Sequence, residues 1–139
     1  MKVHKTKARP LAGTSYKEIR KKAFGLYQEI KRKSKRKPYV RSMYFKKEKV
    51  FLDLFWGHTF EKNHWDQMRR MKFFACGIEL IQKSTFEPTT KENPNKRGEV
   101  LHLFAGVSAT SELFFVQITE DRPTSKKFLI SIFPLEKPR

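Results

Sequence analysis

The sequence is poor in the residues that stabilise secreted proteins or anchor membrane proteins. It has a single cysteine, Cys76, in 139 residues, so no internal disulfide can form and a reducing, cytoplasmic location is expected. No apolar run approaches the length of a membrane span, and the opening residues lack the apolar stretch of a signal peptide. We therefore expect a protein that works without disulfides, a membrane span or export.

Patterns that bind metals or phosphates are also missing. The six glycines are dispersed, which excludes a glycine-rich loop around phosphates. Neither CxxC nor HExxH occurs, and the residues able to ligate zinc lack its usual spacing; they are His58, His64, His102 and Cys76. Cys76 follows Phe73 and Phe74, where a buried structural cysteine is expected. The sequence therefore predicts neither a metal site nor a cofactor.

Acidic residues are scarce, and basic residues crowd one part of the chain. The protein has 31 Lys and Arg residues against 14 Asp and Glu, a formal net charge of +17 at pH 7. Residues 1–49 hold 18 of these basic residues with 3 acidic ones, a net of +15, whereas residues 50–139 are nearly neutral at +2. A basic segment on a near-neutral body indicates attraction to a polyanion, nucleic acid first and an anionic membrane second.

Residues 1–38 are predicted to form a flexible basic arm followed by a basic helix. Ser15 followed by Glu18 is a capping box that begins the helix, and Pro38 marks the boundary after it. The helix has one apolar stripe, formed by Tyr16, Ile19, Ala23, Leu26, Tyr27 and Ile30. A compact domain, residues 39–139, is predicted to follow.

The middle of the chain predicts a second helix and a loop. The run over residues 50–56 is apolar except at Asp53, and it fits a buried strand as well as a short helix. Asn63 is a suitable N-cap for a helix over about residues 64–83, and proline, asparagine and glycine indicate a loop over residues 87–98. This part therefore adds a longer helix to the fold.

The last forty residues change from helical to alternating periodicity. They predict three strands, over residues 99–107, 113–119 and 128–133, whose short connections make them an antiparallel meander. Helices followed by strands indicate an α+β fold, with N-terminal helices packed on a small C-terminal antiparallel β-sheet. A hydrophobic content of 38%, with 13 Phe, is enough for such a core.

Each predicted strand has one apolar face and one face with a polar residue near its middle. Symmetric turns place His102 opposite Gln117, and Gln117 opposite Ser131. These residues would form a row across one face, framed by Phe104, Phe115, Leu129 and Phe133. Such a row is typical of a floor on which aromatic rings stack bases, and also of the solvated face of an antiparallel sheet. The aromatic neighbours favour the binding floor.

Three stretches of the C-terminal part resemble the barnase–EndoU–colicin–RelE-like nuclease superfamily, particularly its phage- and mobile-element-associated branches. They are residues 99–106 (EVLHLFAG), 113–118 (LFFVQI) and 127–134 (KFLISIFP), which follow a helical N-terminal half. The resemblance implies metal-independent RNA cleavage on the open face of a small antiparallel sheet, by a basic or imidazole side chain with cationic phosphate ligands. The sequence departs from it because the second and third predicted strands hold no His, Glu or Tyr.

Metal-independent RNA cleavage needs a base for the 2′-hydroxyl, an acid for the leaving oxygen and cations for the charged phosphorane. An imidazole can change its charge near neutral pH, so His102 is the candidate base or acid. The candidate catalytic residues beside it are Ser131, Arg69, Arg70 and His58. Each of them also fits an ordinary structural position on a loop, a solvated helix face or a strand.

Phosphate contacts are expected along the basic segment and at the sheet. The candidate nucleic-acid-binding residues are Lys17, Arg20, Lys21, Lys31, Arg32, Lys33, Lys35, Arg36, Lys37, Gln117 and Lys127. The basic segment also fits a docking arm for an acidic partner, such as an antitoxin or immunity protein. We predict a metal-independent endoribonuclease, toxin-like or from a phage or mobile element, that binds RNA through this segment. The alternative is a non-catalytic nucleic-acid-binding module.

Overall fold

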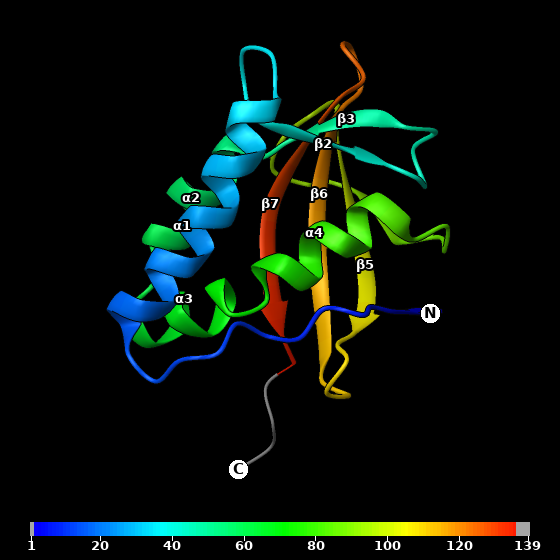
Figure 1. Cartoon of the computed structure of the whole chain (residues 1–139). Coiled ribbons are helices and arrows are strands. Elements are labelled where there is room, and N and C mark those ends of the chain that lie inside the picture. The colour runs from blue at the N-terminus through cyan, green and yellow to red at the C-terminus, as the bar shows by residue number, and fades with distance from the viewer. Residues whose placement is uncertain (1, 136–139) are drawn as a thin grey trace.

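The chain folds into a mixed α/β structure with four helices and seven strands over residues 2–135, which the computed structural model describes (Figure 1). The strands are β1 (Val3–Lys5), β2 (Tyr39–Ser42), β3 (Glu48–Phe51), β4 (Thr89–Glu92), β5 (Glu99–Val107), β6 (Leu113–Asp121) and β7 (Lys126–Pro134). The helices are α1 (Tyr16–Lys33), α2 (Asp53–Phe60), α3 (His64–Met71) and α4 (Phe74–Lys83). None of the helices in this range is long and apolar enough to cross a bilayer.

All the strands belong to one sheet, in the order β1-β5-β6-β7-β3-β2, with β4 also paired to β5. Its centre is the antiparallel meander of β5, β6 and β7 that the alternating periodicity predicts. At the edges, β1 lies parallel to β5, and β3 lies parallel to β7. The predicted combination of helices with an antiparallel meander is therefore confirmed. The prediction of a small, C-terminal sheet is wrong, because strands from the N-terminal half extend the meander on both sides.

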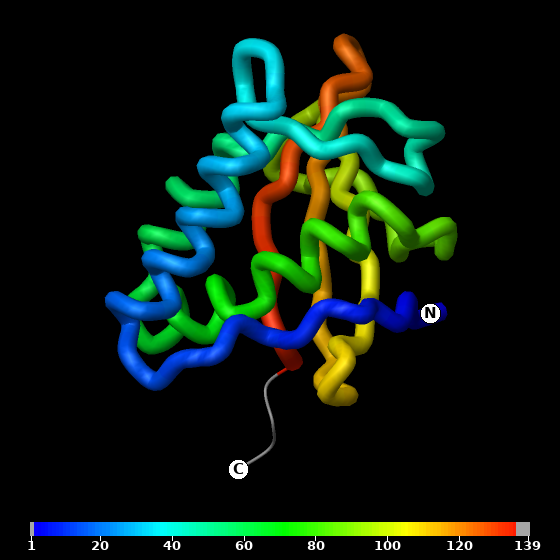
Figure 2. Tube along the Cα trace, in the orientation of Figure 1, coloured from blue at the N-terminus to red at the C-terminus, as the bar shows by residue number. Residues whose placement is uncertain are grey.

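The N-terminal segment is part of this sheet and of its core. Its first residues form β1, and the backbone N–H of Lys7 donates to the carboxylate of Glu79 on α4 at 2.7 Å. Figure 2 shows this segment running alongside α4 to reach the sheet. Ile19 and Ala23 of α1 are fully buried. The prediction of a flexible arm is therefore wrong, because these residues pair with β5. The sequence holds no sign of this strand, since three residues are too few to show a periodicity.

The predicted helix starts are confirmed by their caps. The hydroxyl of Ser15 accepts a hydrogen bond from the N–H of Glu18 at 3.2 Å. The side-chain oxygen of Asn63 accepts one from the N–H of Asp66 at 2.9 Å. Such caps satisfy backbone donors that the first turn of a helix leaves free, and they depend on residues close in sequence.

The lengths of the middle elements differ from the prediction. The helix expected over residues 64–83 is two helices, α3 and α4, separated by residues 72–73. The apolar run over residues 50–56 holds the end of β3 and the start of α2, so it is both strand and helix. The loop expected over residues 87–98 contains β4. Tertiary pairing sets these boundaries, which apolar runs alone leave open.

The helices cover one face of the sheet. Helix α4 crosses it, α2 and α3 pack against β7, and α1 packs on α3 (Figure 1). A Cβ at Gly106 of β5 would lie 2.7 Å from Leu80 of α4, so glycine allows the close approach. We call this side the covered face; its buried residues include His102, Phe104, Phe114, Val116, Ile118, Leu129 and Ile132. The other side, the open face, carries the half-buried Leu101, Leu103, Phe115, Gln117, Phe128 and Phe133.

The pairing of β5 with β6 differs by one residue from the predicted register. His102 lies opposite Ile118 instead of Gln117. Because side chains alternate along a strand, a shift of one residue moves a side chain to the other face. His102 therefore lies on the covered face, and the predicted polar row across three strands is wrong. Its other pair, Gln117 opposite Ser131, is confirmed.

The shift originates in the turn between β5 and β6. The turn is centred on Thr110, and Ser111 adopts a left-handed conformation with φ of 65°. Glycine usually occupies this position in a three-residue hairpin loop, because it has no Cβ to clash. A serine in its place hides the turn geometry from sequence analysis.

Strand β7 contains a β-bulge that changes which of its residues share a face. Ser131 pairs with Gln117 and Leu129 with Ile118, so one residue of β7 has no partner on β6. Phe128 and Ser131 therefore both lie on the open face, although they are three positions apart. Leu129, which was expected to frame the polar row, is fully buried in the core.

Candidate functional site

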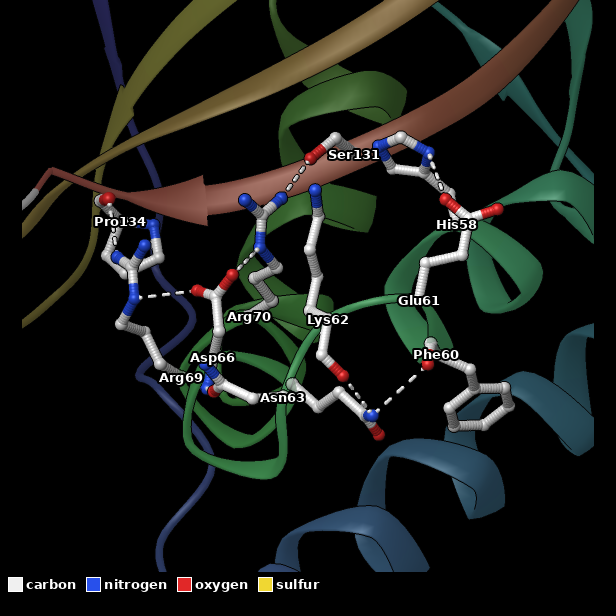
Figure 3. A network of polar contacts seen from close by, with 11 residues as sticks. His58, Phe60, Glu61, Lys62, Asn63, Asp66, Arg69, Arg70, Ser131 and Pro134 are labelled. Carbon is white, nitrogen blue, oxygen red and sulfur yellow. Dashed lines mark hydrogen bonds and ion pairs between the residues drawn. The ribbon is translucent and has the colours of Figure 1, made fainter.

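A cluster of cationic side chains lies along the part of β7 that β3 leaves unpaired. Ser131 of β7 is 3% exposed there, and its Oγ accepts a hydrogen bond from Nη1 of Arg70 on α3 at 2.6 Å. Figure 3 shows Arg70 and Lys62 pointing toward Ser131, with the ring of His58 beside the same strand. We call His58, Lys62, Arg70 and Ser131 the edge cluster.

Asp66 orients the two arginines of α3. Its Oδ1 accepts from Nε of Arg69 at 3.0 Å, and its Oδ2 accepts from Nε of Arg70 at 3.2 Å. Arg69 also donates to the carbonyl of Pro134, and the guanidinium of Arg70 lies 5.4 Å from the centre of the Phe133 ring. Arg70 keeps three N–H groups without a partner among residues 2–135. The side chain of Arg70 is 15% exposed at this edge of the sheet.

His58 adds an imidazole to the cluster from the last turn of α2. Its side chain is 39% exposed, and its Nδ1 lies 3.9 Å from Oε2 of Glu61. Burial lowers the pKa of His58 below its ordinary value of 6.5; Lys62 and Arg70 lower it further by charge, whereas Glu61 raises it. The lowered pKa favours the neutral ring, the state that accepts a proton.

Lys62 is the member of the edge cluster that sequence reasoning missed. It lies half-buried in the short turn between α2 and α3. Gln67 holds this turn, because its Nε2 donates to the carbonyl of Lys62 at 2.7 Å and its Oε1 accepts from the hydroxyl of Tyr16. The sequence did hold one signal for it. Lys62 directly precedes the N-cap Asn63, and this cap fixes the position of the turn that carries Lys62.

His102 lies apart from the edge cluster, on the covered face. It is 7% exposed, its Nδ1 is 2.8 Å from Oγ1 of Thr90, and its Nε2 is 2.9 Å from Oε1 of Glu120. Its ring also packs edge-on against Phe45. Both nitrogens are engaged and the ring lies on the covered face, so the geometry favours a structural role for His102 over the predicted catalytic one. Arg70, His58 and Ser131 are the predicted catalytic residues that meet in one place, with Arg69 joined to them through Asp66.

The basic residues of α1 and of the following loop are exposed, as contact with phosphates requires. They are Lys17, Arg20, Lys21, Lys31, Arg32, Lys33, Lys35, Arg36 and Lys37. Gln117 is half-buried on the open face. Lys127 is buried, with its Nζ 3.2 Å from Oε1 of Glu48 and 3.8 Å from Oε2 of Glu120. The structure gives no support to the predicted contact of Lys127 with nucleic acid, because these carboxylates pair with its ammonium.

Cys76 is buried, as predicted. Burial raises the pKa of its thiol to about 11, so the thiol is protonated at neutral pH and is not a nucleophile. Within residues 2–135, no group of three or more His, Cys, Asp and Glu side chains is placed to hold a metal ion.

Comparison with protein-family models, curated proteins and solved structures finds no match to this chain. The resemblance to a nuclease superfamily therefore remains an expectation from the sequence.

Proposed function

We propose that the protein is a metal-independent ribonuclease whose active site is the edge cluster. The observation that carries the proposal is an imidazole, His58, placed beside two cations, Lys62 and Arg70, at the edge of the open face. A neutral imidazole acts as a general base near neutral pH, and fixed cations stabilise the charge of a phosphorane. RNA supplies its own nucleophile, the 2′-hydroxyl, so these groups suffice for cleavage.

In the proposed reaction the 2′-hydroxyl of RNA attacks the adjacent phosphorus and loses its proton to His58. The bond from phosphorus to O5′ breaks, and the leaving oxygen takes a proton from the ammonium of Lys62. Arg70 donates to the phosphate oxygens, while Ser131 and Asp66 hold its guanidinium in place. The products are a 2′,3′-cyclic phosphate and a 5′-hydroxyl, and proton exchange with water restores both side chains.

The exposed cations of α1 and of its following loop supply the attraction to RNA in this proposal. Their effect depends on the phosphates and not on the base sequence. Ile19 and Ala23 tie α1 into the core, so its cations form a fixed surface. The setting that we propose is a toxin-like, phage or mobile-element nuclease acting in the cytoplasm. An acidic antitoxin or immunity protein is the expected protein partner.

Incubation of the purified protein with labelled RNA and EDTA tests the proposal. We expect cleavage that resists the chelator and leaves 2′,3′-cyclic phosphate ends. Arg70→Gln should lower the rate by about 100-fold or more, because it removes a charge from the transition state. Arg122→Gln is the matched control, since Arg122 is an exposed arginine that pairs with Glu92 elsewhere. A wild-type protein that leaves RNA intact in EDTA over about pH 5 to 9 would contradict the proposal.

A non-catalytic nucleic-acid-binding module is the second candidate. It is favoured by the net charge of +15 in residues 1–49, which provides affinity for RNA without any cleavage chemistry. This alternative predicts RNA binding that weakens with salt and no cleavage products. The EDTA assay, together with a binding measurement, separates the two candidates.

A further inference from the structure

A second feature of the open side lies near the start of β7, away from the edge cluster. It is a pocket of about 330 Å³, at which the loop after α1 meets β3 and β7. Its lining residues are Lys35, Arg36, Lys37, Lys49, Phe51, Lys126 and Phe128. We call it the basic pocket. Its volume is at the lower end of the range for small-ligand sites, which suits a group the size of one nucleotide.

Two aromatic rings form part of the basic pocket. Phe51 of β3 pairs in register with Phe128 of β7, and their ring centres are 5.8 Å apart. Both side chains are only half-buried, although phenylalanine is usually a core residue. Partly exposed aromatic rings beside cations are the usual platform on which proteins stack the bases of single-stranded nucleic acid.

Five cations line the basic pocket, and its lining contains no acidic residue. Among residues 2–135, Lys37 has one acidic partner, Asp53, at 3.9 Å, and the other four cations have none. A pocket of about 300 Å³ at the loop between β4 and β5 differs, because Glu92 and Glu99 pair with two of its three cations. The uncompensated charge of the basic pocket therefore suits phosphate groups.

The basic pocket and the edge cluster lie on the same side of the sheet. Phe128 pairs with Thr119, and Ser131 pairs with Gln117, two positions away on β6. Thr119 and Gln117 lie on the same face of β6, so Phe128 and Ser131 lie on the same face of β7. The β-bulge accounts for the odd number of positions between them. Three residues of a strand span about 10 Å. A chain held at the edge cluster would therefore reach the basic pocket within a few nucleotides.

We propose that the basic pocket binds one base and its flanking phosphates in a single-stranded stretch of RNA next to the cleaved bond. The base stacks on Phe51 and Phe128, and the phosphates contact Lys49, Lys126 and the loop after α1. This inference rests on the proposed function, since it takes RNA as the ligand. It adds a requirement for an unpaired base, because a base within a duplex cannot stack on a protein ring.

Binding of a 2′-O-methyl oligonucleotide, measured by fluorescence anisotropy, tests the basic pocket. This RNA analogue lacks the attacking hydroxyl, so binding is measured without cleavage. Phe128→Leu should raise the Kd about 5- to 100-fold, the usual effect of losing one base-stacking ring. Phe86→Leu is the matched control, because Phe86 is a half-buried ring outside the pocket. Its Kd should stay within about twofold of the wild type.

A charge variant provides an independent measurement. Lys49→Gln with Lys126→Gln should lower the slope of log Kd against log salt by about 1.4, because each phosphate contact of a single strand contributes about 0.7. Lys91→Gln with Lys96→Gln removes the same charge from exposed residues outside the pocket and should leave the slope unchanged.

These measurements separate failure of the pocket from failure of the nuclease. Equal Kd values and salt slopes for the pocket variants and their controls would overturn the basic pocket, whether or not the wild type cleaves RNA. Pocket-dependent binding of the analogue, with ordinary RNA left intact in EDTA, supports the pocket and overturns the nuclease. Tighter binding to vesicles of anionic phospholipid than to RNA would also overturn the basic pocket as an RNA site.

Discussion

Histidine and cationic side chains have opposite environments on the covered face and in the edge cluster. On the covered face, His102 and Lys127 are buried, and their polar atoms are satisfied by neighbouring residues. In the edge cluster, His58 makes no hydrogen bond to residues 2–135, and Arg70 keeps N–H groups without partners among these residues. The role of a histidine or a cation here depends on its partners and its exposure more than on its type.

Glu120 shows how the covered face uses its charges. Its carboxylate is 2.9 Å from His102 and 3.8 Å from Lys127, so it joins the two residues that were expected to act on RNA. A buried polar group without a partner costs about 1 to 3 kcal/mol. Removing one partner from this network should therefore lower the stability of the fold.

The largest contrast is expected between the two histidines. His58→Gln should lower the rate of RNA cleavage by about 10²- to 10⁴-fold, because it removes the general base. His102→Gln should leave kcat nearly unchanged in protein that is folded by circular dichroism. Rates measured in EDTA at about pH 7 provide the check, and equal losses in the two variants would break the distinction between the faces.

Adjacent lysines on β7 provide the second contrast, in stability. Lys127→Ala should lower the free energy of unfolding by about 2 to 3 kcal/mol, because it removes the buried cation that pairs with Glu48 and Glu120. The effect is not larger because both carboxylates are partly exposed. Lys126→Ala, at an exposed position, should change it by less than about 0.5 kcal/mol and weaken RNA binding instead. Urea unfolding measures the first effect and anisotropy the second, and the reverse pattern would contradict our account.

Ser131 is expected to have a smaller effect, through Arg70. Ser131→Ala removes a hydrogen bond to a charged group and should lower kcat about 10-fold, with little change in KM. Ser131→Thr keeps a hydroxyl and should restore most of the rate. A threonine variant as slow as the alanine variant would indicate that the position matters for packing and not for holding the guanidinium.

The smallest effect concerns the pKa of His58. Lys62 lowers this pKa and Glu61 raises it, so Lys62→Gln should raise it and Glu61→Gln should lower it. A general base works when deprotonated, so the acidic limb of the cleavage rate should move to higher pH in the first variant and to lower pH in the second. Titration of the His58 ring by NMR measures both shifts. Shifts of the same sign would contradict the electrostatic arrangement.

Sequence patterns predicted the elements whose signals are local. The caps at Ser15 and Asn63, the apolar stripe of α1 and the cores of the three meander strands involve residues close together in the chain. The pair of Gln117 with Ser131 was also predicted. β1 and the parallel pairing of β3 with β7 join residues far apart in sequence, so local periodicity carries no signal for them.

The candidate site could be predicted only in part, because its residues meet through contacts between distant segments. Arg70, His58 and Ser131 were named as residue types suited to RNA cleavage, whereas Lys62 was missed and His102 was assigned to the wrong face. A register shift of one residue places His102 on the covered face. The shift comes from the turn, in which Ser111 adopts a left-handed conformation although it is not a glycine. A register is set by turn geometry and by packing on both faces, and parity along one strand cannot reveal either.

The sequence by itself determined the charge, the concentration of that charge in the first third, the single cysteine and the periodicity of the helices and central strands. These properties follow from composition and from neighbours along the chain. The tertiary structure decided which polar side chains are desolvated and paired, as at His102 and Lys127, and which stay available, as at His58 and Arg70. That difference depends on burial and on contacts between distant segments, because desolvation and partner geometry exist only once the chain has folded.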